Sequence, residues 1–162
     1  PAETPTVTRT SLTANQAALL DRDESEAVFS TERLLTDPAT GTRILHRTLI
    51  PFDTADQVPA IAEHPDAEPA KLYEQLAAAD QALTWTETVT ARAPMPDERA
   101  ALNAPETPAI LVTYRITRGT NNQPLMLEET KASADAAQLT YAITADKAPS
   151  RRRTSPTGPK SA

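Results

Sequence analysis

The chain has 162 residues, of which 39% are apolar, 4% are aromatic and none is cysteine. This length allows one domain with a core of mainly aliphatic side chains, and the lack of cysteine excludes a disulfide scaffold, a thiol nucleophile and a thiolate zinc site. No apolar run approaches the ~20 residues of a membrane span, and the N-terminus lacks the basic and apolar regions of a signal peptide. A cytoplasmic protein is therefore expected.

The formal net charge is -6, but the two signs are unevenly distributed. The residues from Ala148 onward carry four basic side chains and no acidic one, which leaves 12 basic against 22 acidic residues, or -10, on residues 1–147. An acidic body repels a phosphate backbone, so we do not expect it to bind DNA by itself. Residues 147–162 are rich in Pro, Ser, Thr and Arg without periodicity, which predicts a disordered basic tail.

The first half of the chain predicts strand, helix, strand, turn and strand, in that order. The strands are predicted at residues 6–12, 27–36 and 42–50. Thr13 followed by Gln16 fits a capping box, which predicts a helix that ends in the charged run 21–24. Residues 37–41 predict a tight turn, because Pro38 fixes φ and Gly41 adopts a left-handed conformation easily.

A connector and a second series of elements follow. Residues 52–68 contain scattered apolar residues, and a helix is predicted from about residue 69 to residue 79 with Leu72 and Leu76 on its apolar side. A short helix is predicted to start in the stretch 94–98, and a polar turn at 119–122. Strands are predicted at residues 83–92, 109–117, 124–132 and 139–144, the last of which is expected to close the sheet.

The two series form an internal repeat. Residues 4–53 align with 86–135 at a constant offset of 82, without a gap and with 13 identical pairs among 50, and residues 54–83 form a helical connector between the copies. A three-stranded half buries too little surface to be stable alone. The sequence therefore predicts an α+β fold: an antiparallel sheet of about six strands, built from two pseudo-symmetric halves, with helices packed against it.

Several short stretches, in this order, resemble one known domain. They are Leu72-Tyr73-Glu74-Gln75-Leu76, Leu83-Thr84-Trp85-Thr86-Glu87, Ala91-Arg92-Ala93-Pro94-Met95-Pro96, Leu111 to Arg115, Gln123-Pro124-Leu125 and Glu128. Together they resemble the UTRA domain, the effector-binding domain of GntR-type bacterial transcription regulators of the HutC subfamily, and the composition is similar to that of actinobacterial members. The resemblance covers roughly residues 5–145 and implies a chorismate-lyase-like fold.

The resemblance also implies a function, a domain organisation and a set of partners. Residues 5–146 are expected to form the effector-binding domain, with no cofactor and no metal. A small-molecule effector would bind in a cleft, and DNA would be bound only through an N-terminal winged helix-turn-helix, which this chain lacks. Exposed sheet edges favour a homodimer. The alternative is a stand-alone enzyme or binding protein of the chorismate-lyase fold.

The candidate ligand-binding residues come partly from this resemblance. It implies that Arg33 and Thr84 hold an anionic group, and Thr86 lies on the same strand face as Thr84. The offset of 82 pairs Arg33 with Arg115 and His46 with Glu128, which completes the candidate set. A guanidinium binds carboxylate or phosphate through two hydrogen bonds.

Structural roles remain open for these residues. Arg33 and Arg115 can instead pair with Glu32, Glu128 or Glu129, which is the favoured reading for Arg115, while His46 and Glu128 can simply face solvent. The three tyrosines and Trp85 are expected to be packing residues first. No catalytic residue or metal ligand is predicted, because the two histidines have no metal-site spacing and no nucleophile motif is present.

Overall fold

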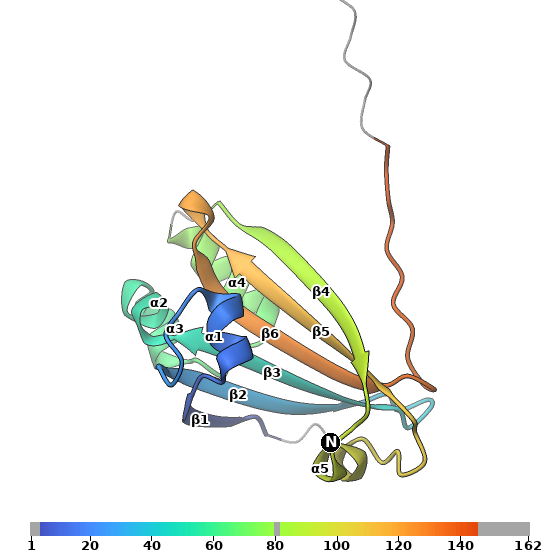
Figure 1. The fold of residues 1–162 in the computed structure, drawn as a ribbon. Coiled ribbons are helices and arrows are strands. Elements are labelled where there is room, and N and C mark those ends of the chain that lie inside the picture. The colour runs from blue at the N-terminus through green and yellow to red at the C-terminus, as the bar shows by residue number, and fades with distance from the viewer. Residues whose placement is uncertain (1–3, 80–81, 146–162) are drawn as a thin grey trace, which may run out of the picture.

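The computed structural model describes residues 4–79 and 82–145. Its centre is a six-stranded antiparallel sheet in the order β1-β2-β3-β6-β5-β4 (Figure 1). The strands are β1 (Thr6–Ser11), β2 (Ala27–Thr36), β3 (Arg43–Pro51), β4 (Thr84–Arg92), β5 (Ile110–Arg118) and β6 (Pro124–Ser133). The helices are α1 (Ala14–Leu20), α2 (Phe52–Gln57), α3 (Pro59–Glu63), α4 (Pro69–Ala78) and α5 (Pro96–Ala101), and Thr120–Asn122 form a 3-10 turn. The predicted fold class is confirmed.

The strand order has the symmetry that the offset of 82 predicts. Subtracting 82 converts β4, β5 and β6 into β1, β2 and β3 within a few residues, and the sheet order reads the same from either edge. Likewise α5 corresponds to α1, and each of these helices follows an edge strand. The axis that relates the halves lies between β3 and β6, which pair at the centre of the sheet.

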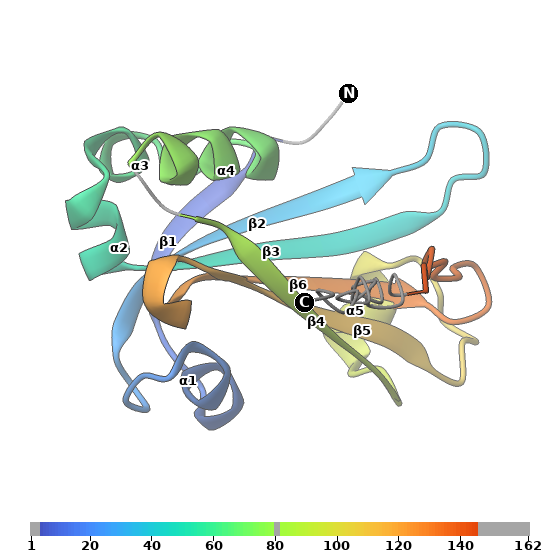
Figure 2. The same cartoon turned by 90° about the horizontal axis from the view of Figure 1, so that it is seen from above.

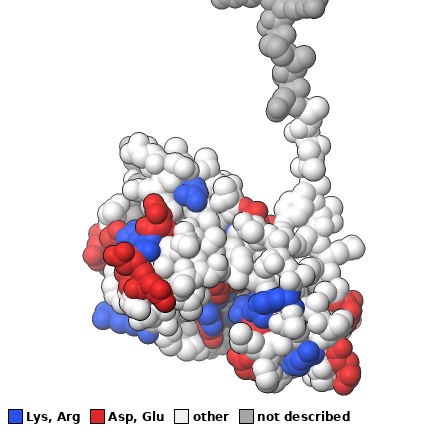
Figure 3. Space-filling view, viewed as in Figure 1, with Lys and Arg blue, Asp and Glu red and all other residues white. Residues whose placement is uncertain are grey.

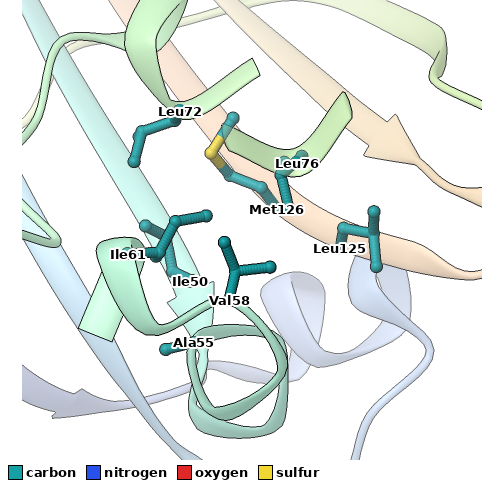
Figure 4. Close-up of a cluster of buried hydrophobic side chains, with 8 residues drawn as sticks. All are labelled: Ile50, Ala55, Val58, Ile61, Leu72, Leu76, Leu125 and Met126. Atoms are coloured by element: carbon teal, nitrogen blue, oxygen red, sulfur yellow. The ribbon is translucent and has the colours of Figure 1, made fainter. Parts of the chain in front are cut away.

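The two faces of the sheet carry different helices. In Figure 2 the helices α2 to α4 lie on one side of the sheet and α1 lies on the other. The largest buried cluster joins α2, α3 and α4 to β3 and β6 through aliphatic side chains (Figure 4). Its members are Ile50, Ala55, Val58, Ile61, Leu72, Leu76, Leu125 and Met126. On the other face, α1 packs Leu20 on Leu49 and Leu127, while Leu102 after α5 packs on Ile110 and Val112.

Two local features that particular residues predicted are present in the structure. Thr13 and Gln16 form the reciprocal hydrogen bonds of a capping box at α1. Gly41 adopts a positive φ of 71° in the turn between β2 and β3. The connector 52–68 contains two short helices, α2 and α3, that the sequence did not reveal, because prolines interrupt its apolar pattern.

One predicted strand is absent from the structure. Residues 139–144 alternate apolar and polar side chains, yet they form no secondary structure and are all exposed. The reason is that no neighbouring strand of the described chain offers them backbone hydrogen bonds, and alternation alone cannot supply a partner. The predicted basic tail, 147–162, lies outside the described residues.

Candidate functional site

Five ionisable side chains form a row across the sheet face that carries α2 to α4. In strand order from β2 to β4 they are Arg33, His46, Glu128, Arg115 and Glu87, and we call them the polar row. Arg33 is directly opposite His46, and Arg115 lies directly opposite both Glu128 and Glu87 on its two neighbouring strands. Side chains two residues apart on a strand share a face, so this register brings all five to one surface.

The centre of the polar row is a buried carboxylate with two partners. Glu128 is 5% exposed, and its Oε1 lies 3.1 Å from Nε2 of His46. The hydroxyl of Tyr73 donates to Oε2 of the same carboxylate. Helix α4 positions this tyrosine because Leu72 and Leu76 are buried beneath it, which holds the adjacent Tyr73 over β6. His46 and Glu128 therefore face each other, 82 positions apart in the sequence.

The environment of Tyr73 gives a prediction for alkaline pH. Burial, and then the Glu128 carboxylate, raise the pKa of Tyr73 to about 12, with a smaller opposing effect from Arg115. A raised folded-state pKa means that the stabilisation is complete below the unfolded value of ~10 and is lost as the pH rises towards 12. In a tyrosinate absorbance titration, one tyrosine should ionise near pH 12, and Tyr73→Phe should remove that late step. A wild-type titration complete by pH 11 would contradict the burial of this hydroxyl.

The Glu87 end of the polar row is more open. Nε of Arg115 donates to Oε2 of Glu87 at 2.8 Å, and the hydroxyl of Tyr141 donates to Oε1 at 2.6 Å. The Tyr141 hydroxyl and then Arg115 keep the pKa of Glu87 below its usual value, against the effect of partial burial. The Tyr73 and Trp85 rings meet edge to face with centroids 5.5 Å apart. Charged groups and aromatic faces are thus presented together.

Two adjacent cavities open onto this end of the row. One, of about 230 Å³, is lined by His46, Glu87, Thr113, Arg115, Glu128 and Thr130. The other, of about 510 Å³, is lined by Tyr73, Trp85, Glu87, Arg115 and Tyr141. Both share Glu87 and Arg115, so together they make one polar surface with an aromatic wall. Such a combination of apolar walls and a few converging polar groups is typical of small-molecule sites.

Arg33, at the opposite end of the row, is buried and only partly satisfied. It is 6% exposed. Its Nη2 donates to the carbonyl oxygens of Asp66 and Ala67 at 2.5 and 2.8 Å, and its Nε lies 3.8 Å from a carboxylate oxygen of Glu68. Nε and Nη1 have no hydrogen-bond partner in the described protein. Buried N–H groups are nearly always paired with protein, water or ligand, so these two donors mark Arg33 as a candidate contact for an acceptor.

Solved structures of bacterial regulators share this architecture. The effector domain of PhnF from Mycobacterium smegmatis has a TM-score of 0.66 and 23% identity over 86% of this chain and 84% of that one. A longer PhnF structure has a TM-score of 0.64 and 22% identity over 90% and 62%. A GntR-family transcriptional regulator from Bacillus cereus has a TM-score of 0.66 and 13% identity over 88% and 100%. No protein-family model and no curated protein matches the sequence.

The chain has the fold of GntR-family effector domains. Identities below 25% establish the fold, and in that respect the resemblance read from the sequence is confirmed. The chain spans 62% of the length of the longer PhnF structure.

Within this effector-domain fold, the candidate residues from the sequence divide into two groups. Arg33, His46, Glu128 and Arg115 share the polar row, whereas Thr84 and Thr86 alternate with Trp85 and Glu87 on β4. The two threonines therefore face the opposite side of the sheet, and both are exposed.

Three participants were not predicted as site residues. Glu87 occupies the row position opposite Arg115, and Tyr73 holds Glu128. Strand alternation places Glu87 on the face of Trp85, a signal that could have identified it. Nothing in the sequence pairs Tyr73 with Glu128, because that contact depends on how α4 crosses the sheet. Tyr141, which also lines the larger cavity, lies beyond the last strand.

The opposite face of the effector-domain fold holds a third cavity, of about 230 Å³, between the sheet and α5. Its charged lining is largely paired internally: Nζ of Lys131 is 2.9 Å from Glu98, and Arg47 is 3.6 Å from Glu129. Figure 3, viewed onto the α1 face, likewise shows acidic and basic side chains next to one another. The polar row also contains internal ion pairs, but its Arg33 keeps two buried donor nitrogens without a hydrogen-bond partner in the described residues, which makes the row the stronger candidate site.

The described residues contain no group of three or more His, Cys, Asp and Glu side chains that could hold a metal ion. Across the same part of the chain, no helix is long and apolar enough to cross a membrane.

Proposed function

We propose that this chain is the effector-sensing and dimerisation domain of a transcription regulator of the GntR/HutC type, acting in the cytoplasm. Residues 5–146 form the sensing domain. The ligand is a small anionic molecule that occupies the cavities along the polar row. It modulates DNA binding by a winged helix-turn-helix that belongs to the same regulator and lies outside this chain.

The observation that carries this proposal is that two arginines lie on the same face of the sheet. One is buried and lacks some of its hydrogen-bond partners, and the other is exposed. Arg33 offers two buried donor nitrogens that have no hydrogen-bond partner among the described residues, and Arg115 lines both cavities. His46 lies between them along the row. Of the two arginines, only Arg115 lines the cavities, and Arg33 lies on the same sheet face. A guanidinium group favours carboxylate or phosphate ligands. The solved effector domain of PhnF, which has the same fold, supports the sensing role.

Regulation requires that the domain adopts two conformations and that the ligand binds one of them more tightly than the other. A ligand shifts such an equilibrium only by its difference in affinity for the two states. The cavities lie between the sheet, which is continuous, and α4 with the segment around Tyr141, which are separate elements. A ligand that contacts both the sheet and these separate elements would favour one position of the elements relative to the sheet. In a homodimer this change in position would be transmitted to a pair of DNA-binding domains.

A thermal-shift screen tests the sensing role. Inorganic phosphate, a sugar phosphate and a dicarboxylate, each at millimolar concentration, serve as anionic probes, with a neutral sugar for comparison. At least one anionic probe should raise the melting temperature by several degrees, because a ligand that binds only the folded state stabilises it by mass action. Arg115→Gln should remove most of that shift.

The matched control is Arg47→Gln, which removes the same charge from β3 on the opposite face of the sheet. It should leave the ligand-induced shift unchanged. If no anionic probe stabilises the wild type, or if Arg47→Gln abolishes the shift and Arg115→Gln does not, the assignment of the polar row as the ligand site is wrong.

A further inference from the structure

The segment after β6 has the pattern of a strand but no strand partner. Leu139, Tyr141 and Ile143 alternate with small or polar residues, and their exposed fractions are 44%, 55% and 92%. The backbone of residues 137–145 makes no hydrogen bond to the described protein, and Tyr141 to Glu87 is the one side-chain hydrogen bond that joins this segment to it. Exposed alternating apolar residues of this kind are stabilised when the backbone pairs with a sheet edge.

The sheet has an open edge of matching length and chemistry. Strand β4 pairs with β5 along one side, and its other side pairs with no described strand. Trp85 and Val89 on this strand are 48% and 41% exposed. The hydrogen bond between Tyr141 and Glu87 favours the β4 edge over the opposite edge, β1.

The existing contact between Tyr141 and Glu87 defines a register. If the segment runs antiparallel to β4 with Tyr141 opposite Glu87, Leu139 lies opposite Val89 and Ile143 lies opposite Trp85. On the other face of the same strand pair, Thr140 lies opposite Thr88 and Thr144 opposite Thr84. In four of the six pairs an apolar side chain therefore meets an apolar one or a threonine meets a threonine, the kind of cross-strand pairing that stabilises sheets. The other two pairs are Tyr141 with Glu87, which are hydrogen-bonded, and Ala142 with Thr86.

We propose that residues 139–144 are an exchanged strand, which pairs with the β4 edge of a second copy of this chain. Within one chain the backbone of this segment makes no hydrogen bond to β4, although the side chain of Tyr141 contacts Glu87 on that strand. A turn joins Ala134 and Ala136 to the end of the sheet, and the three Cα steps from Ala136 to Leu139 span at most ~11 Å. A position outside β4 is three strand spacings, ~14 Å, from β6. That distance is longer than this link spans, so residues 139–144 pair with the β4 edge of a second copy, whose position the link does not limit.

The exchange completes the candidate site. In the dimer, Tyr141 of the partner subunit closes the cavity that Tyr73, Trp85, Glu87 and Arg115 line on this chain. Ile143 of the partner subunit covers Trp85. This inference rests on the homodimer of the proposed function and adds that each ligand cavity contains residues of both copies. A two-fold axis makes the exchange reciprocal, so the β4 edge of each copy is paired.

Cysteine cross-linking tests the exchange, because the chain has no cysteine of its own. Thr88→Cys and Thr140→Cys are prepared as separate single variants and mixed under mild oxidation. Directly opposed residues in an antiparallel pair have Cα atoms 4.5–5.5 Å apart, within the range that a disulfide bridges. The mixture should yield a disulfide-linked species of twice the chain mass. The matched control, Thr84→Cys mixed with Thr140→Cys, is four positions out of register and should yield at least tenfold less.

Three outcomes overturn the proposal. The first is a double variant, Thr88→Cys with Thr140→Cys, that forms only an intrachain disulfide at all concentrations. The second is no cross-linking in either mixture, and the third is equal yields in both. Ile143→Asp should also lower the cross-linking yield while leaving the fold intact, since this side chain is 92% exposed in the single chain. A dimer seen by sedimentation without these cross-links would reject the exchange and leave the sensing function standing.

Discussion

Replacing Glu98 by glutamine should lower the free energy of unfolding at pH 7 by about 3 kcal/mol. Glu98 is 5% exposed, and it accepts two hydrogen bonds from Arg92 at 2.7 Å each and one from the Met95 backbone at 2.9 Å. Nζ of Lys131 lies 2.9 Å from the same carboxylate. A neutral amide cannot accept from all of these donors, so two cations would lose their partner next to α5. Chemical denaturation with urea measures the change.

The pH dependence provides a second signature of the same group. Arg92, then the Met95 N–H and Lys131, hold the pKa of Glu98 well below its usual value, although burial alone would raise it. A depressed folded-state pKa means that the stabilisation is complete above the unfolded value of ~4.3 and is lost as the pH falls below it. The difference between the wild type and Glu98→Gln should therefore shrink steadily from pH 5 towards pH 2.

Glu74→Gln is the matched control for Glu98. Glu74 also pairs with a lysine, at 3.0 Å from Lys71, but its side chain is 69% exposed. Exposed pairs contribute roughly 0–1 kcal/mol, so this variant should change the unfolding free energy by less than about 0.5 kcal/mol. Equal effects of the two substitutions would mean that Glu98 is not the buried centre of a charge network.

The two repeat-related arginines should differ strongly when each is replaced by methionine. Arg33→Met should cost about 3 kcal/mol, because it removes a charged donor that is only 6% exposed and binds the carbonyl oxygens of Asp66 and Ala67. Arg115→Met should cost less than about 1 kcal/mol, since the Arg115 side chain is 47% exposed and its pair with Glu87 lies near solvent. Urea unfolding of the two variants, side by side, provides the comparison.

Proteolysis shows whether the loss at Arg33 is local. The segment that Arg33 holds connects α3 to α4, so cleavage near residues 64–68 should become faster in Arg33→Met and stay unchanged in Arg115→Met. If Arg115→Met proves as destabilising as Arg33→Met, the structural role assigned to Arg33 is wrong.

The polar row shows how far the sequence could lead. The offset of 82 matches Arg33 with Arg115 and His46 with Glu128, and strand alternation puts each on one face, so the central part of the row was predictable. The partners of the two arginines were not. Glu32, Glu128 and Glu129 were considered, but Arg115 pairs with Glu87, and Arg33 with the loop before α4. Local patterns do not specify which loop closes over a strand, because that depends on packing between distant segments.

Residues 139–144 show a different limit of sequence reasoning. Their alternation predicted a strand, and no described strand pairs with them. Alternation reports which side chains would share a face, and it contains no information about where the partner backbone lies or to which molecule it belongs. Helices α2 and α3 were missed for a simpler reason, since Pro59 and Pro65 break the apolar periodicity that a longer helix would show.

The contact between His46 and Glu128 has a consequence for how such a chain can arise. In a symmetric pair of half-length ancestors, the two positions beside the axis would be encoded by one codon and would carry the same residue. Two glutamates there would repel each other, and two histidines would bring no opposite charge. Once both copies lie in a single gene, each position mutates independently. The histidine His46 can then face the carboxylate of Glu128 at 3.1 Å. A pocket that exact two-fold symmetry would line with identical residues at both ends can thereby acquire different residues at each end.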